Sequence, residues 1–123
     1  EMWGGLTPTF WDYATLAGHE RREWDEFWYV LAGLDGLTTA NERAVLSLSR
    51  DAGGLVLSVA SPSANDWTLS VWQGDSEIGR WACAVRPGAP CSARLEENAW
   101  NATAGVDVRI VDGAGQIVLA YDG

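Results

Sequence analysis

The sequence contains no lysine, only one histidine and no long apolar run. All of its basic residues are arginines, and 8 of them stand against 17 aspartates and glutamates, which gives a net charge of -9. A surface this acidic repels phosphate groups, so we expect no binding to nucleic acids or to anionic membrane surfaces. No stretch approaches the roughly 20 apolar residues that a membrane-spanning helix needs. We therefore expect no membrane span.

Recognised catalytic patterns are also missing. The single histidine, His19, stands among charged residues with no nucleophile beside it. The sequence has no Gly-x-Ser-x-Gly motif, no phosphate-binding loop and no spacing typical of metal ligands. Carboxylates are abundant, but nothing selects two of them as an acid–base pair. We predict a protein that is not an enzyme and that uses no metal and no cofactor.

Cysteine is scarce as well, with Cys83 and Cys91 as the only two. A turn at residues 86–90 separates them, so they could form a disulfide worth about 2–3 kcal/mol or remain free thiols in a reducing cytoplasm. Two cysteines alone do not complete a zinc site. The residues leave both redox states open. The first five residues show no signal-peptide features, and we expect a cytoplasmic location slightly ahead of a secreted one.

From residue 41 onward, short stretches of alternating apolar and polar residues are separated by turn signals. The stretches are 44–49, 55–59, 67–72, 77–85, 93–96, 106–111 and 116–121. The last two flank residues 112–115, whose glycines suit a hairpin loop. Short strands at this spacing are typical of a sandwich. The sequence therefore predicts an all-β fold, an antiparallel β-sandwich.

The first 36 residues have a different character. Trp24, Phe27, Trp28 and Leu31 have the spacing of a buried helix face. The same stretch also alternates, and its aromatic and β-branched residues favour a strand. A glycine-rich joint at residues 33–37 follows. We expect two parts, an aromatic-rich N-terminal segment at 1–36 that packs on or adjoins the rest, and a β-sandwich domain at 37–123.

Tryptophan is unusually common. The eight tryptophans are Trp3, Trp11, Trp24, Trp28, Trp67, Trp72, Trp81 and Trp100. Indole rings stack on sugar rings, but they also fill cores and domain contacts, and we favour this second use. Trp72 and Trp100 fall outside the apolar phase of their surroundings. They are our candidates for an exposed carbohydrate platform, with Asp66 or Glu77 as a carboxylate that could bind sugar hydroxyls.

The N-terminal half resembles an uncharacterised bacterial family in which a galactose-mutarotase-like β-supersandwich is often joined to tetratricopeptide repeats. The stretches that carry the resemblance are 1–5, 8–11, 16–18 and 23–29. The glycine-rich joint and the pair Ala40 and Asn41 match the opening of a following immunoglobulin-like module. One departure is Val30, where the family pattern has proline. The resemblance implies a strand at 19–31, with a helix as the alternative, and it transfers no catalytic residue.

These observations give one leading hypothesis and two alternatives. The leading hypothesis is a non-catalytic accessory β-sandwich module of a carbohydrate-associated bacterial protein. A stand-alone carbohydrate-binding module would instead present two exposed, coplanar tryptophan rings beside a free carboxylate. A structural or protein-interaction domain would use the aromatic N-terminal segment as a strand or helix added to a partner. The expected partners are thus a carbohydrate or an adjoining protein domain.

Overall fold

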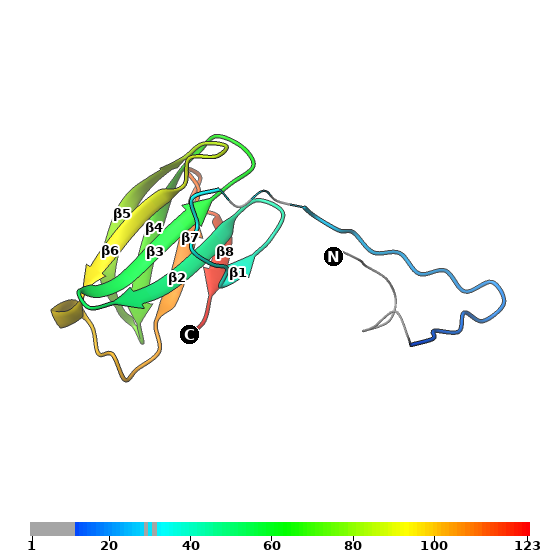
Figure 1. The fold of residues 1–123 in the computed structure, drawn as a ribbon, viewed down its shortest axis with the longest axis horizontal. Helices are drawn as coiled ribbons and strands as arrows, with labels where there is room; N and C mark the ends of the chain where they lie inside the picture. Colours follow the sequence, from blue (N-terminus) through cyan, green and yellow to red (C-terminus); the bar gives the residue numbers. More distant parts are fainter. Residues whose placement is uncertain (1–11, 29, 31) are drawn as a thin grey trace.

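The chain folds into a β-sandwich of two four-stranded antiparallel sheets (Figure 1). The computed structural model describes residues 12–28, 30 and 32–123. The first sheet has the strand order β1-β2-β3-β6, and the second has the order β5-β4-β7-β8. The described residues contain no α-helix and only one short 3-10 turn. The predicted all-β sandwich is therefore confirmed.

The chain crosses from one sheet to the other three times, between β3 and β4, between β5 and β6, and between β6 and β7. The strands of the first sheet are β1 (Thr39–Ala40), β2 (Val45–Asp51), β3 (Gly54–Ala60) and β6 (Cys91–Glu96). Those of the second sheet are β4 (Asn65–Gln73), β5 (Ser76–Val85), β7 (Asp107–Val111) and β8 (Ile117–Tyr121). The 3-10 turn η1 (Glu97–Ala99) follows β6.

The core lies between the sheets and is made by alternate residues of each strand, because successive side chains of a strand point to opposite faces. Leu57 on β3, Leu69 on β4 and Ile110 on β7 have no exposed surface. Trp67 on β4 is 4% exposed and belongs to the same cluster, against which the partly buried Trp81 packs. These two tryptophans are therefore structural side chains of the sandwich.

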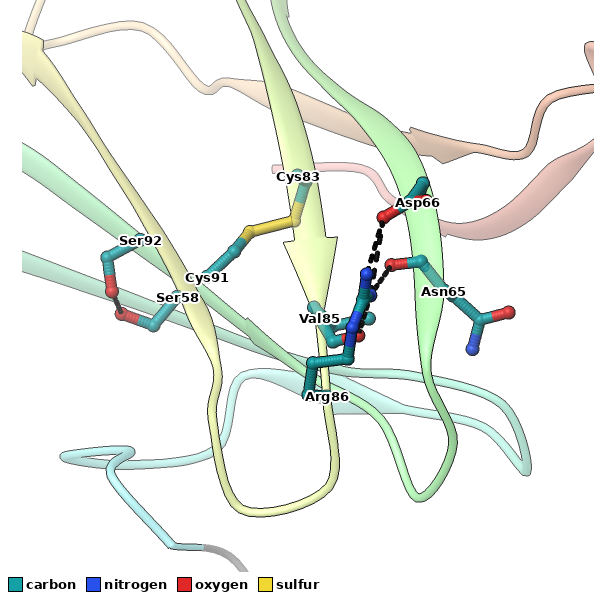
Figure 2. Close-up of a disulfide and its surroundings, with 8 residues drawn as sticks. All are labelled: Ser58, Asn65, Asp66, Cys83, Val85, Arg86, Cys91 and Ser92. Atoms are coloured by element: carbon teal, nitrogen blue, oxygen red, sulfur yellow. Dashed lines mark hydrogen bonds and ion pairs between the residues drawn. A yellow bond between two sulfur atoms is a disulfide. The ribbon is translucent and has the colours of Figure 1, made fainter.

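A disulfide joins the two sheets along one side. Cys83 on β5 and Cys91 on β6 are bonded, with their Cα atoms 5.6 Å apart (Figure 2). Since β5 and β6 are edge strands of different sheets, the bond links sheet to sheet. Between them the backbones of Arg86 and Ala89 exchange two hydrogen bonds of 3.1 and 2.9 Å, which closes a tight turn. The oxidised pair is thus the form that the fold contains.

The sandwich has two distinct ends. The tryptophan end contains Trp72 and Trp100, together with η1 and the C-terminus. The proline end contains Pro62, Pro87 and Pro90, and the N-terminal segment leaves the sandwich there. Because the strands of both sheets run between these ends, a residue at the start of a strand and one at its end can belong to opposite ends of the molecule.

Within residues 19–28, the structure shows neither the strand that the resemblance implies nor the helix that the aromatic spacing favours. Residues 19–28 form no regular element, and Figure 1 shows them running away from the sandwich. The physical reason is the absence of a partner, because a short helix gains most of its stability from packing and a strand needs a neighbour. We call residues 12–28, 30 and 32 the arm. Trp3, Trp11 and Leu31 lie outside the described residues.

Candidate functional site

The structure brings two of the predicted carbohydrate contacts, Trp72 and Trp100, to the same end of the sandwich. Trp72 is the next-to-last residue of β4, and Trp100 follows η1. The adjacent residues connect the two segments, since the Gln73 side chain accepts a hydrogen bond of 3.0 Å from the Asn101 amide and donates one of 2.9 Å to the Asn101 carbonyl. Hydrogen bonds therefore fix the loop after η1 to the end of β4 at the tryptophan end.

Trp72 lies half-buried on the outer face of the second sheet. Its indole Nε1 donates a hydrogen bond of 3.1 Å to Ser70 Oγ. The guanidinium of Arg109, on the neighbouring strand β7, stands 4.7 Å from the centre of the ring. A cation in this position is attracted by the ring electrons and covers one ring face. One face of the Trp72 ring is therefore covered by an arginine of the same chain.

Trp100 is held in a similar way. The Arg50 guanidinium lies 4.6 Å from its ring centre and also donates a hydrogen bond of 3.3 Å to the Ala102 carbonyl. Trp100 is only partly exposed and packs against the core cluster. Its Nε1 atom is buried without a hydrogen-bond partner among the described residues. The ring therefore fastens the loop after η1 to the sandwich.

Asp66 does not join these tryptophans. It lies near the start of β4, six residues before Trp72, which corresponds to about 20 Å along an extended strand. Its carboxylate accepts two hydrogen bonds of 3.2 Å from Arg86 at the proline end (Figure 2). The sequence had the signal for this separation, because Asp66 directly precedes the predicted strand 67–72 and Trp72 stands at its other end.

The other carboxylate suggested by the sequence, Glu77, does lie opposite Trp72 in the β4–β5 ladder. The Arg80 guanidinium donates to both of its oxygens, at 2.8 and 2.6 Å. These hydrogen bonds favour the charged form and hold the pKa of the Glu77 carboxyl below its ordinary value. Both carboxylate oxygens of Glu77 therefore already accept a hydrogen bond from within the chain.

This geometry predicts the pH behaviour of Glu77. The Arg80→Gln variant should raise the pKa of Glu77 to the ordinary glutamate range, as measured by carbon-detected NMR titration. Because the folded-state pKa is depressed, the ion pair contributes stability above the pKa of an unfolded glutamate and loses it as pH falls through the folded value. Arg86→Gln, at the other end, is the control and should leave Glu77 unchanged. An unchanged pKa in Arg80→Gln would contradict this assignment.

The same pattern extends to the whole sequence, because every arginine contacts a carboxylate or an indole ring of its own chain. The pairs are Arg21–Glu23, Arg22–Glu20, Arg43–Asp112, Arg50–Trp100, Arg80–Glu77, Arg86–Asp66, Arg94–Asp51 and Arg109–Trp72. Since the chain has no lysine, its cationic side chains are used internally. The charges left for an outside partner are therefore negative.

The arm presents a second candidate site. Tyr13, Trp24, Phe27 and Trp28 are 98, 54, 59 and 61% exposed, and they are the most exposed aromatic side chains among the described residues. Large apolar groups gathered on one exposed segment are typical of a contact surface. The sequence pointed to Trp72 and Trp100 as the exposed tryptophans. Trp24 and Trp28 are more exposed than either.

The root of the arm is anchored on the proline end. Trp28, Val30 and Ala32 of the arm line an apolar pocket of about 220 Å³. Its other wall is formed by the start of β2, the end of β3 and the β5–β6 turn, that is by Val45, Ala60, Ser61, Pro62, Pro87, Gly88, Ala89 and Pro90. Gly33 then turns the chain with a φ of +76°, and a side chain there would crowd Pro90. The arm therefore leaves from a defined point.

Neither candidate site contains, among its described residues, a cluster of side chains that could bind a metal ion. The described residues hold no group of three or more histidine, cysteine, aspartate or glutamate side chains that could bind a metal ion. In the same part of the chain no helix has the length and hydropathy needed to cross a bilayer. No family model, curated protein or solved structure matches the chain. The contacts and exposure of the side chains at the two sites are therefore the basis for a function.

Proposed function

We propose that this chain is a non-catalytic accessory β-sandwich of a carbohydrate-associated bacterial protein, and that its arm attaches it to a neighbouring protein domain. The observation that carries the proposal is the exposure of Trp24, Phe27 and Trp28 beside a sandwich whose core is already filled. Aromatic residues are enriched where one protein surface contacts another. The association with carbohydrates rests on the family resemblance of the N-terminal half.

An immunoglobulin-like classification is part of the same proposal. The strand order β5-β4-β7-β8 supports it, because it corresponds to the order C′-C-F-G of such domains when β4 is taken as strand C. The buried Trp67 on that strand also supports it, since a tryptophan on strand C packs in the core of immunoglobulin domains. The disulfide differs, because it joins the edge strands β5 and β6.

The alternative of a stand-alone carbohydrate-binding module has weaker support. Such a module needs exposed rings and free hydrogen-bonding groups at one place. Here Trp72 and Trp100 each carry an arginine on the ring, and the neighbouring Glu77 is occupied by Arg80. Each of these three side chains therefore already has a partner within the chain.

A glycan-array screen of the full chain separates these two functions. We expect no binding to any glycan above background, with the same result for the Trp72→Ala/Trp100→Ala double variant. Binding by the intact chain that disappears in the double variant would overturn the accessory function and identify a sugar-binding tryptophan end. A Trp24→Ser/Phe27→Ser variant serves as the control, since it removes two large aromatic side chains from the arm and leaves the tryptophan end intact.

A further inference from the structure

We infer that the arm binds by strand addition: residues 21–28 would pair as an extra strand with the open edge of an antiparallel sheet in another protein domain. That edge would have an apolar strip on one face and cationic side chains beside it. This inference rests on the proposed function, because it specifies how the arm attaches. Three features of residues 21–28 carry it, namely their backbone conformation, their unpaired backbone groups and their charge.

The backbone of this segment is already extended. Arg22 bonds Glu20 at 2.7 Å, the indole of Trp24 bonds Glu26 at 3.0 Å, and Arg21 pairs with Glu23. Each contact joins residues two apart. Only an extended chain brings such residues to the same side, whereas a helix turns them away from each other. Because the segment is already extended, its addition to a sheet as a strand costs little conformational entropy.

The backbone groups of the segment are unpaired within the described residues. Between residues 12 and 28, the only backbone–backbone hydrogen bond is from the Glu20 amide to the Ala17 carbonyl, at 3.0 Å. It closes a turn in which His19 has a φ of +67°. Residues 21–28 run from this turn to the pocket at the proline end. Such a row of free amides and carbonyls is what a sheet edge pairs with.

Side-chain alternation gives the segment two different faces. Trp24 and Trp28 share one face, separated by about 13 Å along the strand. Phe27 lies on the other face together with the acidic residues Glu23 and Asp25. A buried aromatic side chain covers about 150–250 Å², and a stable interface needs about 800 Å² from each partner. Three aromatic residues and eight residues of paired backbone supply an area of that order.

Charge identifies the kind of partner. Residues 12–28 contain five acidic and two basic residues, and the whole chain has a net charge of -9. The two arginines of the segment are already paired with Glu20 and Glu23. A second copy of this chain would bring like charge to the interface, which is unfavourable. An edge flanked by lysine or arginine complements the carboxylate of Asp25 and the net negative charge of the chain, so we assign the arm to a different, cationic domain.

The test uses the full chain and two designed probes. Each probe is an open-edged antiparallel sheet protein with an apolar strip beside its edge, flanked by lysine and arginine in one probe and by glutamate and aspartate in the other. We expect calorimetry to show binding to the cationic probe and at least tenfold weaker binding to the acidic one. Hydrogen exchange of the complex should protect alternate amides of residues 21–28, because only every second amide of an added strand faces its neighbour.

Proline substitutions test the pairing directly. Asp25→Pro and Glu26→Pro each remove one amide, and these two amides point to opposite sides of an extended chain. One variant should therefore lose tenfold or more in affinity relative to its control, Asp25→Asn or Glu26→Gln, while the other loses less. The Trp24→Ser/Phe27→Ser variant should lose binding while its sandwich unfolds at the same temperature as that of the original chain.

The outcomes separate the inference from the proposed function. If the Trp24→Ser/Phe27→Ser variant loses binding, but both proline variants bind like their controls or the protected amides are contiguous, the arm attaches in another way and only strand addition is overturned. If this double variant binds normally, the arm is not the attachment and both proposals fail. Absence of binding to the cationic probe overturns the inference. Concentration-dependent dimers of the chain in sedimentation velocity would overturn the choice of a different partner.

Discussion

Replacement of Trp67 by alanine is expected to lower the free energy of unfolding by about 3–5 kcal/mol, the usual cost of truncating a buried aromatic residue. Trp67 is 4% exposed on the inner face of β4, directly opposite Cys83 in the β4–β5 ladder. Its removal leaves a cavity between the sheets that the packed neighbours cannot fill completely. Urea-induced unfolding followed by far-ultraviolet circular dichroism measures the loss.

The matched control for this prediction is Trp72→Ala on the same strand. Trp72 is half-buried and faces outward, and it contributes one hydrogen bond and one ring contact with Arg109. We expect that truncation to cost no more than about 2 kcal/mol, because an exposed cation–ring contact and a single hydrogen bond are each worth about 1 kcal/mol. Equal losses in the two variants would contradict the assignment of Trp67 to the core and Trp72 to the surface.

Removal of the disulfide by the Cys83→Ala/Cys91→Ala double substitution should cost about 2–3 kcal/mol, the amount that closing so short a loop takes from the unfolded chain. The bond joins residues eight apart in sequence. For a domain of this size, such a loss lowers the melting temperature by on the order of 10 °C. Thermal unfolding with and without reductant provides the measurement.

The reductant gives this experiment its control. The original chain should become less stable when a reductant is added, whereas the double variant should show the same melting temperature in both conditions. A chain whose stability does not respond to reductant would argue against the bond.

Alternation alone located most of the strands. The stretch 55–59 lies within β3 (Gly54–Ala60), and 67–72 lies within β4 (Asn65–Gln73). Alternation succeeds there because one face of each strand is buried, so the apolar phase is under strong physical constraint. The pairing of β3 with β6 could not be predicted in the same way, because it joins segments on either side of two strands that belong to the other sheet.

The candidate site was less predictable, for two physical reasons. The arginines that cover Trp72 and Trp100 lie 37 and 50 residues away in sequence, on strands whose neighbours only the fold defines. The conformation of the arm could not be predicted for another reason. Its sequence suits a helix or a strand, and neither form gains the packing that would stabilise it. Residues 19–28 therefore take neither form in the chain by itself.

The positions of the arm and the C-terminus at opposite ends of the sandwich have a mechanical consequence. The arm leaves at the proline end, while Gly123 bonds Asp107 at the tryptophan end. A pull applied between these two points acts along the strands and loads the hydrogen bonds of a ladder together in shear, because they run perpendicular to the strands. The disulfide joins β5 and β6, which carry neither chain end. Resistance to stretching therefore depends on β1–β2 and β7–β8, the ladders nearest the points of attachment.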